Sequence, residues 1–188
     1  DRNMRDQINN RATPLILSPN SENNILNYAI FKNSINIVEF LLKNNFKIEN
    51  ETLLNLSYSS EELNSSNNDT IDDSNSKENF VKDFELNRLK ILDLLIKNNA
   101  DLNSSDKSYG ETLLMVAVDR DQADVVKTLI KNKVDLNEVN SKSESALTRA
   151  VIADNIILAQ LLLENGADVN IKNKNGESLV KLASSVEM

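Results

Sequence analysis

The feature that most constrains the fold of this chain is an internal repeat with a period of 33 residues. Three segments align without gaps, at 110–117, 143–150 and 176–183. The apolar pairs Leu129-Ile130 and Leu162-Leu163 are also 33 residues apart, and a polar turn follows each pair. Because two independent registers share one spacing, coincidence is a poor explanation. The sequence therefore predicts an array of similar repeats that stack on one another.

Each repeat is predicted to hold two short antiparallel helices followed by an extended loop. The hydroxyl of Thr112 or Ser145 can cap the first helix. Asp121 or Asp154 lies where that helix must stop, and aspartate tolerates the left-handed conformation that such a turn requires. The second helix is expected from about residue 122 to 132, with apolar residues at helical spacing. We expect the following helix residues to form the core: Val125, Leu129, Leu161, Leu162 and Leu163.

These repeats resemble the ankyrin repeat. Residues 162–170 read LLENGADVN, and residues 98–103 read NNADLN, which is similar to the end of the second ankyrin helix and the loop after it. The resemblance implies an all-α, ankyrin-type α-solenoid of helix–turn–helix repeats with short hairpin-like turns. The histidine of the ankyrin pattern, and with it the side-chain network that links threonine and histidine between repeats, is missing at Asn27, Asn55, Met115, Thr148 and Lys181.

The resemblance covers residues 20–188, as about four full repeats plus a terminal half repeat. Residues 1–19 are read as an irregular N-terminal cap or the remnant of an upstream repeat. Residues 58–83 form an acidic, Ser/Asn-rich insertion between the two helices of one repeat. Its first two-thirds predict a loop, either a tolerated surface insertion or a contact segment. Phe80, Val81 and Phe84 predict that the following helix extends backwards into the insertion.

The composition argues against catalysis and against bound cofactors or metals. The chain has no His and no Cys, which removes the commonest general base and the thiolate chemistry. Its three glycines, at 110, 166 and 176, are too dispersed for a phosphate-binding loop. A calcium loop that starts at Asn67 fails because Asp72 stands where glycine is required. We therefore expect no enzyme activity, no catalytic residue, no cofactor and no metal.

The net charge of −8 disfavours nucleic acid as a partner, because phosphate backbones need clustered lysine and arginine. No stretch approaches the roughly 18 apolar residues of a membrane span, so no membrane contact is expected. The resemblance implies a protein partner, met by loop tips and by the exposed face of each first helix. We expect a non-catalytic protein–protein interaction module that is monomeric.

One position on the expected binding face is glutamate in four repeats, immediately before the residue that caps the first helix. These residues are Glu51, Glu111, Glu144 and Glu177. Stacking would place them in a ladder about 10 Å apart, which could bind a basic surface or basic peptide. The alternative is that glutamate early in a helix favours the helix macrodipole and has no binding role.

The loop tips supply the other candidate binding residues, which are Ser108, Tyr109, Ser141, Lys142, Lys174 and Asn175. Tyr109 is either an interface anchor or packs on its own loop. Arg149 stands in a column that is otherwise Tyr28, Leu56, Val116 and Leu182. Its side chain either lies over the core with its charge in water, or pairs with a nearby carboxylate.

Two other roles stay open beside a stand-alone binding protein. The chain could be the scaffold portion of a larger multidomain protein, or a chaperone-like binder of a client protein. The richness in asparagine suggests a low-GC microbe as the source. A soluble chain of this kind fits a cytoplasmic or an exported location equally well.

Overall fold

The computed structural model describes residues 23–57, 74–172 and 174–178, and every regular element within them is a helix. The chain divides into two compact units, residues 1–100 and 101–188. They are called unit 1 and unit 2 and are described separately. The predicted all-α class is confirmed for the described part of the chain.

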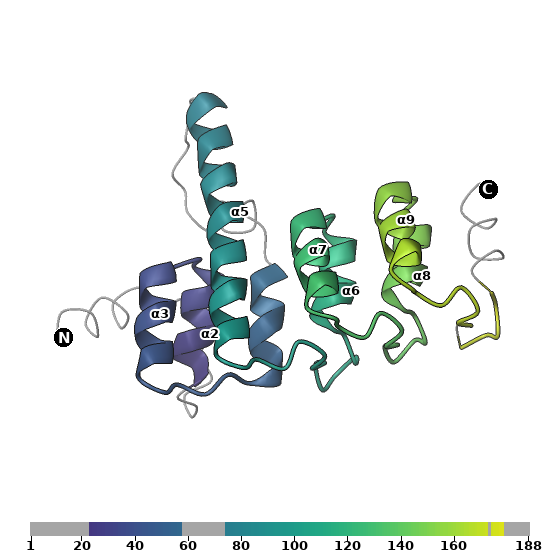
Figure 1. The fold of residues 1–188 in the computed structure, drawn as a ribbon, viewed down its shortest axis with the longest axis horizontal. Coiled ribbons are helices and arrows are strands. Elements are labelled where there is room, and N and C mark those ends of the chain that lie inside the picture. Colours follow the sequence, from purple (N-terminus) through teal and green to yellow (C-terminus); the bar gives the residue numbers. More distant parts are fainter. Residues whose placement is uncertain (1–22, 58–73, 173, 179–188) are drawn as a thin grey trace. The chain divides into compact units, whose positions relative to one another are not determined.

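Unit 1 contains α2 (Asn23–Phe31), α3 (Ile35–Lys43), the 3₁₀ helix η1 (Asn50–Ser57) and α5 (Ser74–Lys97). Helix α2 packs on α3 and η1, and both of those pack on α5 (Figure 1). The α2–α3 turn passes through Asn33, whose φ of 54° is left-handed. The buried core consists of Leu26, Val38, Leu41, Leu53, Ile91, Leu92 and Leu95.

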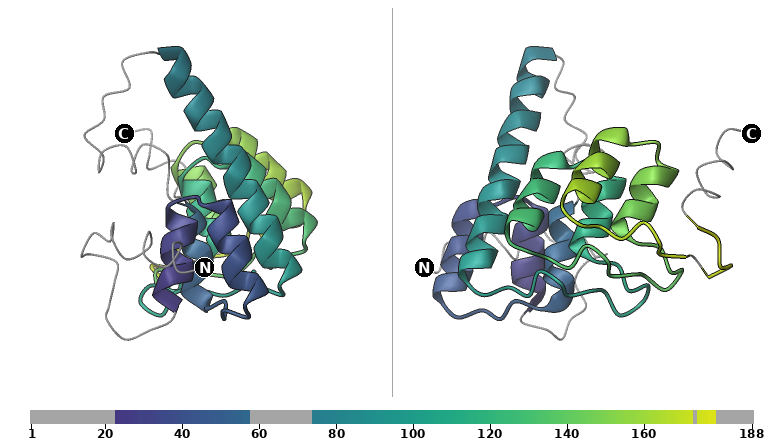
Figure 2. Two further views of the ribbon diagram at one scale, coloured as in Figure 1. Left: turned by 90° about the vertical axis from the view of Figure 1, so that its left-hand side faces the viewer. Right: turned by 45° about the vertical axis from the view of Figure 1, so that its right-hand side comes forward.

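Helix α5 is 24 residues long, and its N-terminal turns extend past the other helices of unit 1 (Figures 1 and 2). It begins at Ser74, inside the predicted 58–83 insertion, so the predicted backward extension is confirmed. The buried Phe84 marks where α5 meets the rest of the unit, because its carbonyl accepts a hydrogen bond of 2.8 Å from the Asn33 side chain. The predicted loop before residue 74 and the predicted cap at 1–19 lie outside the described residues.

Unit 2 contains α6 (Leu113–Asp119), α7 (Ala123–Lys131), α8 (Ala146–Ile152) and α9 (Ile156–Glu164). Helices α6 and α7 form its first repeat, α8 and α9 its second, and α6 packs on α8 (Figure 2). Thr112 and Ser145 cap α6 and α8 by accepting from the backbone N–H three residues later, at 3.3 and 3.2 Å. Asp121 and Asp154 have φ of 53° and 52°. The predicted caps and turns are confirmed.

The core of unit 2 follows the prediction at three of the five positions. Val125, Leu129 and Leu162 are fully buried, and Leu161 is half-buried. Leu163 is 44% exposed, so its assignment to the core was wrong. The main neighbour of α9 among the described helices is α8, and Leu163 lies on a side of α9 that α8 does not cover.

An asparagine ladder joins the long loops of unit 2. Each loop carries an Asp-x-Asn turn in which the asparagine N–H donates to the aspartate side chain two residues earlier. The Asn103 side-chain oxygen then accepts from the Asp135 N–H at 2.8 Å, and the Asn137 oxygen accepts from the Asp168 N–H at 2.8 Å. The Asp-x-Asn motif of the repeat therefore fixes both the turn itself and the stacking of one loop on the next.

Candidate functional site

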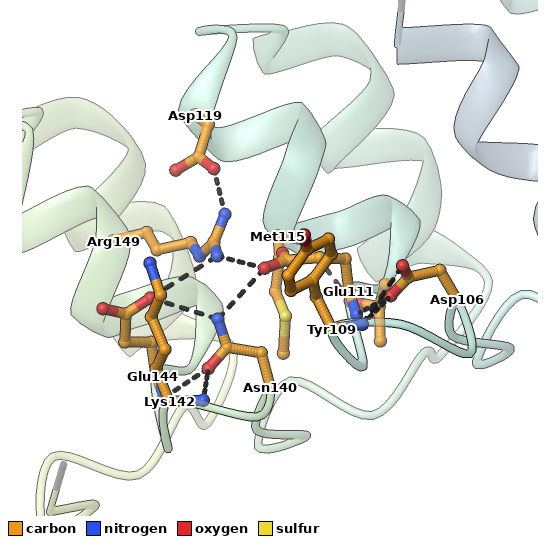
Figure 3. Close-up of polar contacts among 10 residues, drawn as sticks. Asp106, Tyr109, Glu111, Met115, Asp119, Asn140, Lys142, Glu144 and Arg149 are labelled. Atoms are coloured by element: carbon orange, nitrogen blue, oxygen red, sulfur yellow. Dashed lines mark hydrogen bonds and ion pairs between the residues drawn. The ribbon is translucent and has the colours of Figure 1, made fainter. Parts of the chain in front are cut away.

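A network of ion pairs centred on Arg149 lies at the junction of the two repeats of unit 2 (Figure 3). Arg149 projects from α8, and its side chain is only 13% exposed. Its Nη2 donates to Glu111 Oε1 at 2.6 Å and lies 3.4 Å from Glu144 Oε2, and its Nη1 donates to Asp119 Oδ2. Of the two readings of Arg149, pairing with carboxylates is therefore the one observed.

Asn140 ties the same carboxylates to the loop that enters α8 (Figure 3). Its buried Nδ2 donates to Glu111 Oε1 and Glu144 Oε2, both at 3.1 Å. Its Oδ1 accepts from the N–H groups of Lys142 and Glu144, both at 2.9 Å. The side chain thus fixes the loop conformation and holds the two glutamates against Arg149.

The geometry differs from a ladder of separate glutamates. Glu111 and Glu144 converge on one amide and one guanidinium, instead of standing about 10 Å apart as free groups. The reason is that Arg149 and Asn140 draw together the side chains of successive repeats. Glu177 is half-buried. Glu51 belongs to unit 1, within η1, and its side chain lies outside the described part.

Asp119 is the third carboxylate of the network and the most exposed, at 42% of its side chain. Burial raises the pKa of Asp119 above its usual 3.8, and the positive charge of Arg149 opposes this without cancelling it. The negative charges of Glu111 and Glu144 add to the rise. With all groups ionised, three carboxylates face one guanidinium, so the face formed by α6 and α8 carries an excess of negative charge.

The six predicted tip residues lie on three successive loops of unit 2, and all six are exposed. Backbone hydrogen bonds join these loops in series. The Ser141 N–H donates to the Tyr109 carbonyl at 2.7 Å, and the Lys174 N–H donates to the Lys142 carbonyl at 3.4 Å. The tips that the sequence singled out at residues 108–109, 141–142 and 174–175 are therefore neighbours in the fold.

Tyr109 has an exposed side chain on a fixed backbone. The residue is 62% exposed, so it does not pack closely on its own loop. Its N–H donates to both side-chain oxygens of Asp106 at 3.2 Å, and its carbonyl accepts from Ser141. Asp106 Oδ1 also accepts from the Glu111 N–H at 2.7 Å, as Asn140 does from Glu144 in the next loop.

Sequence reasoning missed three residues of this site: Asp106, Asp119 and Asn140. Aspartate or asparagine at the start of a polar turn is a recognised signal for side-chain capping of that turn, so Asp106 and Asn140 could have been found. Asp119 could have been found from its separation of 30 residues from Arg149, close to one repeat period.

The described residues contain no group of three or more acidic, His or Cys side chains placed to hold a metal ion. No helix in the described part combines the length and the apolar character needed to cross a membrane. The contacts within the Arg149 network are ion pairs and hydrogen bonds between protein groups, and they connect α6 and α8 to the loops that precede them.

Comparison with known families agrees with the repeat pattern. The family model described as ankyrin repeats (3 copies) matches residues 83–173, which begins within α5 and spans both repeats of unit 2. No curated protein matches the chain. Ankyrin repeats in general are non-catalytic modules of protein–protein interaction. The helix pairs, capped first helices and stacked loops, together with this match, show that residues 83–173 of the chain are ankyrin repeats.

Proposed function

We propose that the chain is a non-catalytic module that binds a protein partner through the loop tips of unit 2 and the adjoining face of α6 and α8. The observation that carries the proposal is Tyr109. It is an aromatic side chain, 62% exposed, on a backbone held from both sides by Asp106 and Ser141. Aromatic anchors of this kind are frequent among the residues that dominate binding energy.

The fixed backbone matters because ordering a loop on binding costs free energy. The tips on either side of Tyr109 are already linked to each other by hydrogen bonds. A partner therefore meets a surface whose loops are ordered before contact, which favours affinity.

The charge around Tyr109 indicates the kind of partner. On the face behind the tips, the carboxylates of Glu111, Glu144 and Asp119 share one guanidinium, that of Arg149. A basic surface or basic peptide fits this excess of negative charge. Lys142 and Lys174 are exposed on the tips themselves and suit carboxylates at the edge of the same partner.

The network changes how the acidic face should be tested. Reversing Glu111 and Glu144 to lysine would place two ammonium groups against Arg149, so a loss of binding could reflect a disturbed fold. Substitution at Tyr109 and at the tips leaves the network in place.

Photo-crosslinking at single positions tests the proposal. A photoreactive phenylalanine analogue replaces Tyr109 in one variant and Leu86 in a control, since Leu86 is also apolar and exposed, at 51%, but lies on α5. In lysate of the source organism or of its host, we expect one protein to crosslink at position 109 and not at position 86. The yield of that crosslink should fall as the salt concentration during irradiation rises, because salt screens the charges that hold the partner. Equal labelling at the two positions, or labelling at position 86 alone, would refute the proposed surface.

A further inference from the structure

Two exposed isoleucines flank the turn between α8 and α9. Ile152 is the last residue of α8 and is 41% exposed, and Ile157 is the second residue of α9 and is 76% exposed. Among the described residues, Ile157 is the most exposed large apolar side chain. The turn lies at the opposite end of α8 from its cap Ser145 and the loop tips.

Stacking of a further repeat does not account for this exposure. The 33-residue period relates Ile152 to Asp119 and Ile157 to Asp124. These aspartate side chains are 42% and 74% exposed, although the second repeat of unit 2 is already packed against the first. A repeat packed in the same way on α9 would leave both isoleucines exposed as well.

Ile156, the residue before Ile157, is also exposed, at 71%. Its equivalent in the first repeat is Ala123, which is half-buried. A further repeat packed on α9 would partly bury Ile156 in the same way, so the exposure of Ile156 is no evidence for a docking surface. Ile157 stands where the first repeat has a charged residue, so its apolar side chain serves neither the core of unit 2 nor the stack.

The surroundings of the two isoleucines are acidic. Asp154 is exposed in the turn, and the Asn155 side chain donates to Asp121 at 2.8 Å, which fixes a second carboxylate at the same end of the repeats. Arg149 is the only cation within α8 and α9 and is held by three carboxylates. At the turn end of α6, Asp119 and Asp121 flank Arg120, so acidic residues outnumber basic ones there.

We propose that Ile152 and Ile157 form a second docking surface, which binds an amphipathic basic helix of another protein. An apolar side chain of that helix would contact the isoleucines, and its lysines or arginines would lie near Asp121 and Asp154. Five residues of chain span at most about 17 Å, so one helix of about 10–12 Å diameter can contact both isoleucines. A second copy of this chain fits poorly, because the acidic turn would face itself and the net charge is −8.

A short fluorescent peptide of leucine and lysine with a helical pattern is the direct probe, and a leucine–glutamate peptide of the same pattern is its control. Binding is followed by fluorescence anisotropy. We expect the leucine–lysine peptide to bind the intact chain, and Ile157→Ser and Ile157→Asp to weaken it at least about tenfold. Ile157→Asp is the sharper variant, because the added charge would by itself attract a basic peptide.

The matched control is Leu86→Asp, which removes an apolar side chain of 51% exposure from α5 and should change binding less than about twofold. Amide NMR shifts caused by the peptide should centre on residues 152–157.

The proposal is overturned if Ile157→Asp binds the peptide as the intact chain does, if Leu86→Asp loses as much affinity, or if the glutamate peptide binds equally well. It is also overturned if sedimentation shows a dimer that Ile157→Asp dissociates, since the occupant is then a second copy. The surface is separate from Tyr109 and the loop tips, so either proposal can fail alone.

Discussion

Arg149 Nη2 lies 2.6 Å from Glu111 Oε1, and this ion pair joins α8 to the residue before the cap of α6, in the preceding repeat. Arg149 occupies a position where other repeats carry Tyr28, Leu56, Val116 and Leu182. The network around it therefore replaces apolar contact at that position with ion pairs. It also links the core of unit 2 to the loops that present Tyr109.

Arg149→Met should destabilise unit 2 strongly, because it leaves Glu111 and Glu144 partly buried without their counter-charge. We expect a loss of about 3 kcal/mol in the free energy of unfolding, the lower end of the range for breaking a buried pair, since the site is not fully dry. Arg149→Lys should recover only part of this loss, because an ammonium cannot form the fork of contacts that a guanidinium makes. Urea unfolding followed by circular dichroism measures both variants.

The control for Arg149 is Lys127→Ala, which breaks an exposed pair with Asp124 at 3.7 Å. It should cost less than about 0.5 kcal/mol. If Arg149→Met costs no more than Lys127→Ala, the network contributes nothing measurable to stability.

Asn140→Ala should cost about 2–3 kcal/mol, because two N–H groups of the loop lose their side-chain acceptor and the two carboxylates keep only Arg149 as a side-chain donor. Hydrogen exchange at the Lys142 and Glu144 amides should accelerate more than elsewhere in unit 2. Asn137→Ala removes one acceptor at an exposed loop and should cost less than about 1 kcal/mol. Protection at Lys142 and Glu144 that survives Asn140→Ala would show that the backbone holds the loop without the side chain.

Much of the fold was predictable because the repeat period and the cap chemistry are local signals. Hydroxyl residues cap the first helices at Thr112 and Ser145, as their type favours. Aspartate takes the left-handed turn position at Asp121 and Asp154. The start of α5 at Ser74 was not predictable in the same way, since serine and asparagine are weak helix formers and favour caps and turns.

The partners of Arg149 could not be chosen from the sequence alone, because the period identifies structural columns but not side-chain rotamers. A partial signal did exist. Contacts between successive repeats of unit 2 join residues 29 to 38 apart in sequence, with Asn140–Glu111 and Arg149–Glu111 at the two extremes. A search for opposite charges near that separation would have found Asp119 and Glu111. The exposure of Leu163 and Ile157 was hidden, because apolar residues at helical spacing are ordinarily core.

Asp119→Asn should change how stability depends on pH. The folded state raises the pKa of Asp119 above 3.8, so it binds the proton more tightly than the unfolded chain does. The contribution of this carboxyl to stability is therefore present at low pH and is lost as pH rises from about 3.8 through the raised value. Relative to Asp119→Asn, the intact chain should lose stability over that interval, by less than about 1 kcal/mol since the group is partly exposed.

Urea unfolding between pH 3.5 and pH 7, roughly the range in which carboxyl groups titrate, measures the difference for Asp119. Glu138→Gln, at an exposed position of the same unit, controls for the loss of one negative charge. A stability difference between the intact chain and Asp119→Asn that grows in favour of the intact chain as pH rises would contradict the assigned direction.

Gly110→Ala and Gly176→Ala form a matched pair that tests how the Tyr109 tip is held. Both glycines have left-handed φ, 70° and 72°. A Cβ at Gly110 would lie 3.5 Å from the backbone of Asn140 and Ser141, which is ordinary contact, and a Cβ at Gly176 would meet nothing within 4 Å. Backbone strain alone should therefore set the cost, about 1–2 kcal/mol for each variant.

The unfolding free energies of Gly110→Ala and Gly176→Ala should agree to within about 0.5 kcal/mol. A larger loss for Gly110→Ala, together with faster exchange of the Ser141 amide, would mean that the close approach of the two loops leaves no room for a side chain, and that the position of Tyr109 depends on glycine there.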